Sequence, residues 1–167
     1  GEIPSEIGQL TNLIQLVLSS NPMTGIIPIE IGNLTKLEKL ILQFNEFSGS
    51  IPTEIGQLIS MTYLKLSDCG LSGTIPSQIG NLSNLTDLYL HHNKLTGEIP
   101  SEIGQLINLK EIHLENNQLS GNIPPVLWSI TNLTDLHFST NELTGEIPSE
   151  IGQLINLKSL RLEQNQF

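Results

Sequence analysis

Residues Gly97–Ser120 read GEIPSEIGQLINLKEIHLENNQLS, and this pattern recurs every 24 residues from one end of the chain to the other. Its Ile-Pro pair is found at Ile3-Pro4, Ile27-Pro28, Ile51-Pro52, Ile75-Pro76, Ile99-Pro100, Ile123-Pro124 and Ile147-Pro148. A fixed period in this range is typical of a solenoid, because each unit can bury its apolar side only by stacking on its neighbours. We therefore expect one array of seven repeats, at residues 1–24, 25–48, 49–72, 73–96, 97–120, 121–144 and 145–167.

Within one repeat, the residue pattern separates a strand side from a helical side. Residues Glu111–Glu115 alternate polar and apolar, which is the period of a half-buried strand. Ile103, Leu106 and Leu109 are three residues apart, which suits a 3₁₀-like turn on the opposite side. Each strand can pair only with those one period away, so the sheet is expected to be parallel. The expected strands are Gln15–Ser19, Lys39–Gln43, Tyr63–Ser67, Asp87–His91, Glu111–Glu115, Asp135–Ser139 and Ser159–Glu163.

One asparagine has the same phase in six of the seven units. Because an amide both donates and accepts, such a row can satisfy backbone groups in the turn after each strand. In the third unit this place belongs to Cys69, the chain's one cysteine, which we interpret as a small buried residue. Trp128, which interrupts the sixth unit, is interpreted as additional core. The ladder positions are Asn21, Asn45, Asn93, Asn117, Asn141 and Asn165.

Composition limits the partners. Hydrophobic residues make up 38% of the chain but aromatic residues only 4%, so the core must be aliphatic. The net charge of −10 argues against nucleic acid and anionic membranes as partners, since both require a positive face. No apolar run approaches the ~20 residues of a membrane span, so no direct membrane insertion is expected in this segment. Neither end shows a signal peptide or an atypical capping repeat, so we expect an uncapped fragment of a longer protein.

The motif L-x-x-L-x-x-L-x-L-x-x-N-x-L-[ST]-G-x-I-P resembles the plant-type leucine-rich repeat, and Leu95–Pro100 and Leu143–Pro148 match its last part in full. The resemblance covers the whole chain. It implies a right-handed α/β solenoid with a parallel β-sheet on the concave face, 3₁₀ turns and loops on the convex side, and often a second short strand. Members include ectodomains of receptor kinases and receptor-like proteins, and inhibitors of fungal polygalacturonases. The resemblance therefore implies an extracellular or cell-surface protein.

The outward strand positions form columns on the sheet, and the chain's chemically dense patch lies on three adjacent strands. It contains His91, His92, His113 and His137 beside acidic side chains. A divalent metal site built on His113 and His137, a pH-responsive contact, and an ordinary solvated recognition face are all compatible with this pattern. Flat sheets rarely converge three ligands on one ion, so we predict no metal site and no cofactor.

We expect no enzymatic activity, because no serine or cysteine nucleophile shares a pocket with the histidines. Ser67 and Ser139 are expected on the open sheet. The function that fits best is recognition of a protein or peptide on the concave face, where aromatic and arginine side chains usually supply most of the binding energy. The expected contacts are Tyr63, Lys65, Tyr89, His91, His113, Glu115, His137 and Arg161.

A structural or surface array is the alternative: a cell-wall scaffold, an ice-binding solenoid or a subunit of a large assembly. For ice binding, the relevant feature is a regular hydroxyl row formed by Thr24, Ser48, Ser72, Thr96, Ser120 and Thr144. Four Asn-Leu-Ser/Thr sequons are candidate glycosylation sites if the protein is secreted, and they are expected toward the convex side. Their asparagines are Asn33, Asn81, Asn84 and Asn132.

Overall fold

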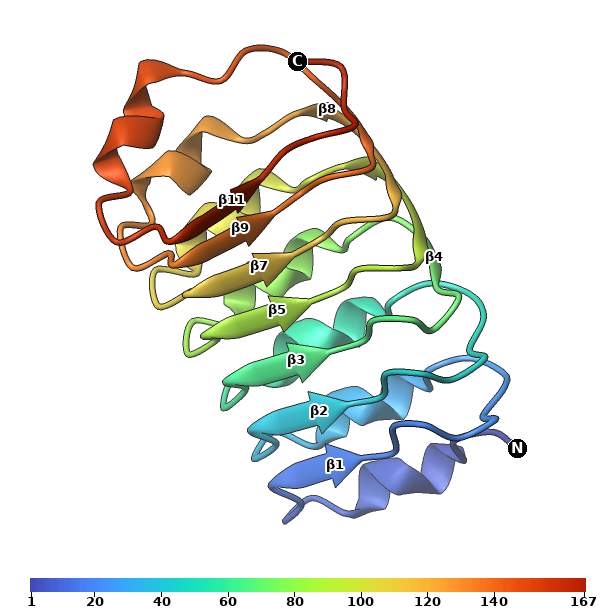
Figure 1. Cartoon of the computed structure of the whole chain (residues 1–167). Helices are drawn as coiled ribbons and strands as arrows, with labels where there is room; N and C mark the ends of the chain where they lie inside the picture. Colours follow the sequence, from blue (N-terminus) through green and yellow to red (C-terminus); the bar gives the residue numbers. More distant parts are fainter.

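The computed structural model describes residues 1–167 and shows a solenoid whose coils stack with the strands on one side and short helices on the other (Figure 1). The main sheet has seven parallel strands in the order β1-β2-β3-β5-β7-β9-β11. Adjacent strands pair one period apart, as in Leu64 with Leu88. The predicted fold is confirmed. The strands are β1 Gln15–Val17, β2 Lys39–Ile41, β3 Tyr63–Lys65, β5 Asp87–Tyr89, β7 Glu111–His113, β9 Asp135–His137 and β11 Ser159–Arg161.

The opposite side of each coil is a five-residue 3₁₀ helix that follows a proline. In all seven units this proline belongs to the Ile-Pro pair and stands just before the helix, where its missing N–H costs nothing, and in six of them its backbone is extended. No helix is long and apolar enough to cross a membrane. The helices are η1 Ser5–Gln9, η2 Ile29–Asn33, η3 Thr53–Gln57, η4 Ser77–Asn81, η5 Ser101–Gln105, η6 Pro125–Ser129 and η7 Ser149–Gln153.

A second, four-stranded parallel sheet runs along the side of the array in the order β10-β8-β6-β4. This is the second short strand that the family resemblance implies, and it is formed in four of the units. It comes from the stretch around the Ser/Thr-Gly pair. Its strands are β4 Ser72–Gly73, β6 Lys94–Glu98, β8 Gln118–Asn122 and β10 Glu142–Thr144.

The strands are shorter than the five residues expected, because each coil turns sharply after its strand. Seven non-glycine residues at the same phase have positive φ between 54° and 59°. This left-handed conformation ends the extended segment, although the ladder bond from Leu18 N to Ile41 O, 2.9 Å, continues past β1. The residues are Ser20, Phe44, Asp68, His92, Asn116, Thr140 and Gln164.

The core is a continuous row of leucine and isoleucine side chains between the sheet and the 3₁₀ helices. Trp128 is buried among them, as predicted. At the last coil, Leu160 is 41% exposed, whereas Leu136 at the equivalent position in β9 is fully buried. The difference arises because β11 is an outer strand of the sheet, with a neighbour on one side only.

The asparagine ladder is present and links neighbouring coils. Asn93 Nδ2 donates to the carbonyl oxygens of Leu66 (2.8 Å) and Leu90 (3.0 Å), and Asn93 Oδ1 accepts from the backbone N–H of Leu71 at 3.0 Å. Cys69 is buried at the same phase, as expected, and its thiol donates to the carbonyl of Leu42 at 3.1 Å. Each turn is thus linked to the neighbouring coils by hydrogen bonds.

Candidate functional site

The outward face of the seven-stranded sheet, which we call the concave face, carries a row of rings across four consecutive strands. Tyr63 on β3 packs against Tyr89 on β5, with ring centroids 5.4 Å apart. Tyr89 packs against His113 on β7 at 4.8 Å, and His113 against His137 on β9 at 4.3 Å. The parallel register places these side chains next to one another, because Tyr89, His113 and His137 are paired positions. We call these four side chains the ring row.

Tyr89 is held in place by one side chain from each neighbouring strand, Glu111 on β7 and Lys65 on β3. Its hydroxyl donates a hydrogen bond to the carboxylate of Glu111 on the next strand. Burial raises the pKa of Tyr89 well above its usual range, and the negative charge of Glu111 adds to the effect. Lys65 Nζ lies 4.9 Å from the centroid of the Tyr89 ring, within range of a cation–π interaction. The phenol is therefore neutral and fixed in orientation.

His137 is more covered than the sequence suggested. Only 8% of the residue is exposed, and its Nε2 lies 2.6 Å from the Ser159 hydroxyl oxygen. Burial lowers the pKa of His137, and the neighbouring His113 lowers it further. We expected His137 as an open contact, but His113 stacks on it. Its role in binding stays a prediction.

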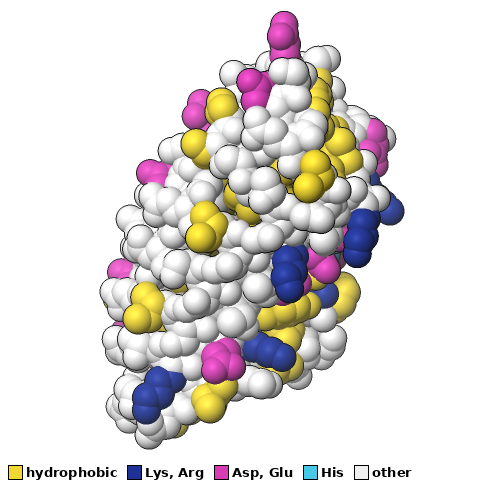
Figure 2. All heavy atoms as spheres, turned by 90° about the vertical axis from the view of Figure 1, so that its left-hand side faces the viewer, with side chains coloured by type: hydrophobic (Ala, Val, Ile, Leu, Met, Phe, Trp, Pro, Cys, Tyr) yellow, Lys and Arg dark blue, Asp and Glu magenta, His cyan; other side chains and the backbone are white.

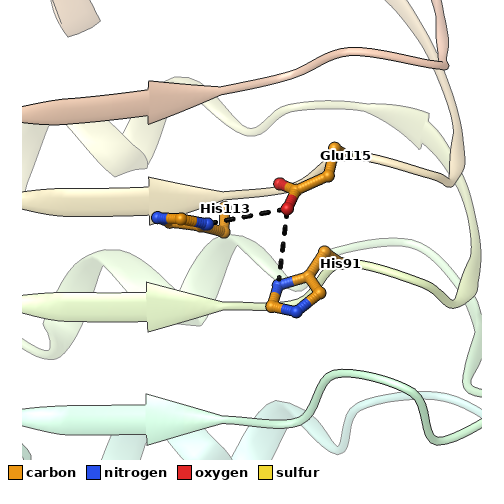
Figure 3. Close-up of side chains that lie close together, drawn as sticks. All are labelled: His91, His113 and Glu115. Carbon is orange, nitrogen blue, oxygen red and sulfur yellow. Dashed lines mark ion pairs between the residues drawn. The ribbon is translucent and has the colours of Figure 1, made fainter. Parts of the chain in front are cut away.

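His113 of the ring row also forms a cluster with His91 and Glu115, and the carboxylate of Glu115 lies between the two imidazoles (Figure 3). Glu115 Oε1 is 3.6 Å from His113 Nδ1 and 3.9 Å from His91 Nδ1. The pairing considered from the sequence was His113 with His137. The structure places His113 against His137 as well, with ring centroids 4.3 Å apart, but the donor atoms that lie within 4.8 Å of one another belong to His91, His113 and Glu115, because His91 and Glu115 occupy the same column one period apart.

The cluster is half-buried, and its surroundings shift the pKa values of His91 and Glu115. Burial lowers the pKa of His91, against the opposing influence of Glu115 and Asp68. Burial raises the pKa of Glu115, but the interactions with His113, with its own backbone and with His91 together outweigh this and leave the pKa below its usual value. Three buried polar atoms in the cluster have no hydrogen-bond partner: His91 Nδ1, His113 Nε2 and Glu115 Oε2. The cluster therefore has unused donor and acceptor capacity.

Two sequence expectations about serines were wrong. Ser67 is fully buried and Ser139 is only 7% exposed, whereas both were placed on the open sheet. Both serines have the same place in the repeat as His91 and Glu115, which face outward, so the difference lies in the short serine side chains, which the neighbouring side chains of the sheet can cover. No open hydroxyl is therefore available at these two positions.

The remaining predicted contacts, Lys65 and Arg161, lie on different coils of the array, at β3 and β11. Lys65 is half-buried under its contact with Tyr89, and Arg161 on β11 is exposed beside His137 in the sheet register. Figure 2 shows the edge of the array where the strands begin, and it is mostly uncharged, with isolated acidic, basic and hydrophobic side chains. The four sequon asparagines, Asn33, Asn81, Asn84 and Asn132, are all exposed.

Comparison with known proteins agrees with this architecture. A family described as "Leucine-rich repeat region" matches residues 41–167, and "Leucine Rich Repeat" matches residues 12–34. The chain belongs to the leucine-rich repeat family. Among curated proteins, no relative matches it. The motif in Leu95–Pro100 is of the plant type, and plant receptor ectodomains are among the similar solved structures.

Three solved structures illustrate the likeness of this leucine-rich repeat chain to known proteins. It is 42% identical to a TDR receptor, with a TM-score of 0.97, and the matching region spans 99% of this chain and 29% of the receptor chain. It is 41% identical to the Arabidopsis receptor kinase HAESA in complex with the peptide hormone IDA and the co-receptor SERK1, with a TM-score of 0.94 and coverage of 98% and 28%. A plant ice-binding protein is 36% identical, with a TM-score of 0.90 and coverage of 99% and 53%.

Sequence reasoning identified the ring row's members but not how they pack. It also missed the cluster of His91, His113 and Glu115 as a unit. A signal for that cluster was present, because His91 and Glu115 are 24 residues apart and so adjacent on the sheet. What the sequence could not supply is the side-chain direction that turns His113 toward Glu115.

Proposed function

We propose that this leucine-rich repeat segment is a recognition module that binds a peptide or protein ligand on its concave face. The observation that carries the proposal is the ring row, which crosses four consecutive strands from Tyr63 to His137 and is flanked by Lys65, Glu111 and Glu115. Aromatic side chains with fixed orientation lose little entropy on binding and bury a large area, so such rows commonly form the energetic centre of an interface.

The solved relatives support this proposal at the level of ligand class. HAESA is described in complex with a peptide hormone, as are PEPR1 with AtPEP1 and RGFR1 with RGF2. An extended peptide laid across the parallel strands would meet the ring row at intervals close to one strand spacing, about 4.8 Å. Polar groups beside the rings would then fix its orientation. We assign no reaction to the chain.

An extracellular or cell-surface location is part of the proposal. It is supported by the likeness to receptor ectodomains and by the exposure of all four sequon asparagines. Asn84 and Asn132 already use Nδ2 to bond the carbonyls of Ile59 and Ile107, at 2.9 Å each, so one of their amide hydrogens stays free. Glycans on these asparagines would lie before the strands and leave the ring row open.

The test uses peptides selected from a random-sequence display library on the immobilised chain, with dissociation constants measured by biolayer interferometry. Variants Tyr63→Ala, Tyr89→Ala and His113→Ala are expected to weaken binding by about tenfold or more each, as for interface anchors. Matched controls on the other side of the coil are Gln57→Ala and Gln105→Ala, which should leave affinity unchanged. Peptides whose affinity survives a combined Tyr89→Ala, His113→Ala and His137→Ala change, but falls with the controls, would place the binding surface elsewhere.

Ice binding is a second candidate, because the plant ice-binding protein shares the fold and because a hydroxyl row runs along the side of the array. In the structure four of the six hydroxyls donate hydrogen bonds within the protein; for example, Ser48 Oγ donates to Gly25 O at 3.2 Å, and Ser72 Oγ to Gly49 O at 3.4 Å. That bonding favours a structural role for the row. A thermal-hysteresis measurement on the same protein separates the candidates. Hysteresis that disappears with Ser72→Val and Thr96→Val would favour ice binding.

A further inference from the structure

The cluster of His91, His113 and Glu115 has the composition and geometry of an incomplete metal centre. One donor atom from each of the three residues lies within 4.8 Å of the others. Around a tetrahedral zinc ion with bonds of about 2.0–2.1 Å, neighbouring donor atoms are about 3.3 Å apart. The measured separations of 3.6 Å and 3.9 Å from Glu115 Oε1 to the two imidazole nitrogens are close to this value. The separation of the two histidine donor atoms is within 4.8 Å, so binding would draw them closer together.

The backbone keeps the three donors in place. Glu115 and His91 follow neighbouring strands of the parallel sheet, and His113 lies two residues before Glu115 on the same side. Each side chain is only 16–17% exposed, so its freedom to turn away is restricted. In Figure 3 the carboxylate points into the space between the two rings. The three donors thus converge on one point, in contrast to the parallel arrangement expected of a flat sheet.

The two histidines also have acidic partners at their far nitrogens. His91 Nε2 lies 3.9 Å from Asp68 Oδ2, and His113 Nε2 lies 3.8 Å from Glu111 Oε2. Histidines that ligate a metal usually direct the second ring nitrogen to a carboxylate or carbonyl, which fixes the ring and increases its basicity. A solvated recognition patch has no need of this arrangement. Each imidazole therefore has a carboxylate near its second ring nitrogen, at 3.8 or 3.9 Å, a separation somewhat longer than a hydrogen bond.

The polar atoms without hydrogen-bond partners also favour a bound metal ion. His91 Nδ1 and Glu115 Oε2 are buried and make no hydrogen bond. Such atoms cost free energy unless something satisfies them. An ion between His91 Nδ1, His113 Nδ1 and Glu115 would satisfy the first directly and draw the carboxylate into coordination. The arrangement suits a borderline ion with nitrogen and oxygen ligands better than calcium or magnesium, which prefer oxygen alone.

We propose that His91, His113 and Glu115 bind one divalent transition ion of the zinc class on the concave face, with Asp68 and Glu111 as outer partners. Three protein ligands leave one position of a tetrahedral site for water or for a group of a bound molecule. This site is independent of the proposed peptide recognition, since it can be measured without any peptide.

The test is calorimetric titration of the whole chain, without a histidine tag, with zinc sulfate. One ion per chain is expected, and His91→Gln, His113→Gln and Glu115→Gln should each weaken binding by about tenfold or more. The matched controls are His92→Gln, an exposed histidine next to the site, and Glu163→Gln, which occupies the Glu115 column two coils away. Both should bind zinc as the unaltered chain does. Asp68→Asn should weaken binding while leaving the stoichiometry at one.

Two further readouts keep the outcome decisive. Cobalt(II) should give the intense visible absorption of a tetrahedral ion with the unaltered chain and lose it in the Glu115→Gln variant. Zinc should also raise the melting temperature of the unaltered chain, because an ion that binds only the folded state stabilises it. The proposal is overturned if no ion binds, if the three ligand variants bind as tightly as the original chain, or if His92→Gln removes binding.

Discussion

The backbone N–H of Cys69 donates to Asn93 Oδ1 at 3.2 Å, so the one cysteine of the chain is tied to the asparagine ladder of the next coil. The same Oδ1 accepts from Leu71, and Asn93 Nδ2 bonds Leu66 and Leu90. A single side chain thus satisfies backbone groups on two coils. The ladder asparagines therefore link neighbouring repeats through hydrogen bonds, and the contribution of each one to stability can be measured by single substitutions.

Asn93→Ala is expected to lower the free energy of unfolding by about 3 kcal/mol, because it leaves several backbone groups in the interior without partners. Urea denaturation followed by circular dichroism measures the change. The matched control is Asn21→Ala: Asn21 is exposed in the first coil and bonds only the carbonyls of Leu18 and Ser19, at 3.1 Å each. Its loss should cost less than about 1 kcal/mol. Equal costs for the two variants would contradict the account of the ladder.

Cys69→Asn is expected to stabilise the protein, because the cysteine leaves one backbone N–H group without a hydrogen-bond acceptor. In the other coils the ladder asparagine accepts from an N–H 22 residues earlier, as Asn45 does from Met23 at 3.1 Å. The equivalent donor for Cys69 is the N–H of Phe47, which has no hydrogen-bond acceptor in the structure. An asparagine carbonyl would supply one. The same urea experiment should show a gain of about 1 kcal/mol, and a loss would show that the local backbone at Gly70, with φ of +78°, does not accept the change.

Much of this architecture could be predicted from the sequence, and the exceptions have a common cause. The 24-residue period predicted the first residue of each of the seven strands in the main sheet, the ladder asparagines, and the interior positions of Cys69 and Trp128. These depend on where a residue lies in the repeat. The burial of Ser67 does not, because His91 and Glu115 have the same place in the repeat and face outward; it depends on the short side chain of Ser67 and on its neighbours. The convergence of His113 on Glu115 depends on side-chain rotamers, which a repeat pattern does not specify.

The thiol of Cys69 is expected to resist alkylation while the protein is folded. Burial raises its pKa to about 12, the backbone hydrogen bond works against this, and Asp68 adds to the rise. At pH 8 only about one thiol in ten thousand would be ionised, and the thiolate is the reactive form. Iodoacetamide labelling followed by mass spectrometry should therefore be slow in buffer and fast in urea.

The same shift has a consequence for stability with a definite sign. The unfolded thiol ionises near its ordinary pKa of about 8.5 and the folded one only near 12. The stabilisation that comes from keeping the thiol protonated is fully present below pH 8.5 and is lost as the pH rises toward 12. Cys69→Ala should flatten that part of the unfolding curve against pH. Rapid labelling of the folded protein at pH 8 would contradict the burial of the thiol.

Gly80→Ala is expected to destabilise the array, because the glycine of the Ile-Gly pair lies where neighbouring coils approach most closely. A Cβ on Gly80 would lie 2.7 Å from the backbone oxygen of Glu102 in the next coil, so the coils would have to move apart at a cost of about 1–3 kcal/mol. Gly152 has the same place in the last coil, and nothing lies within 4 Å of its Cβ position. Gly152→Ala should therefore be neutral or stabilise by up to about 1 kcal/mol, through the lower entropy of the unfolded chain. Melting temperatures of the two variants, measured side by side, should move in opposite directions or by clearly different amounts, and equal losses would mean that spacing between coils does not explain these glycines.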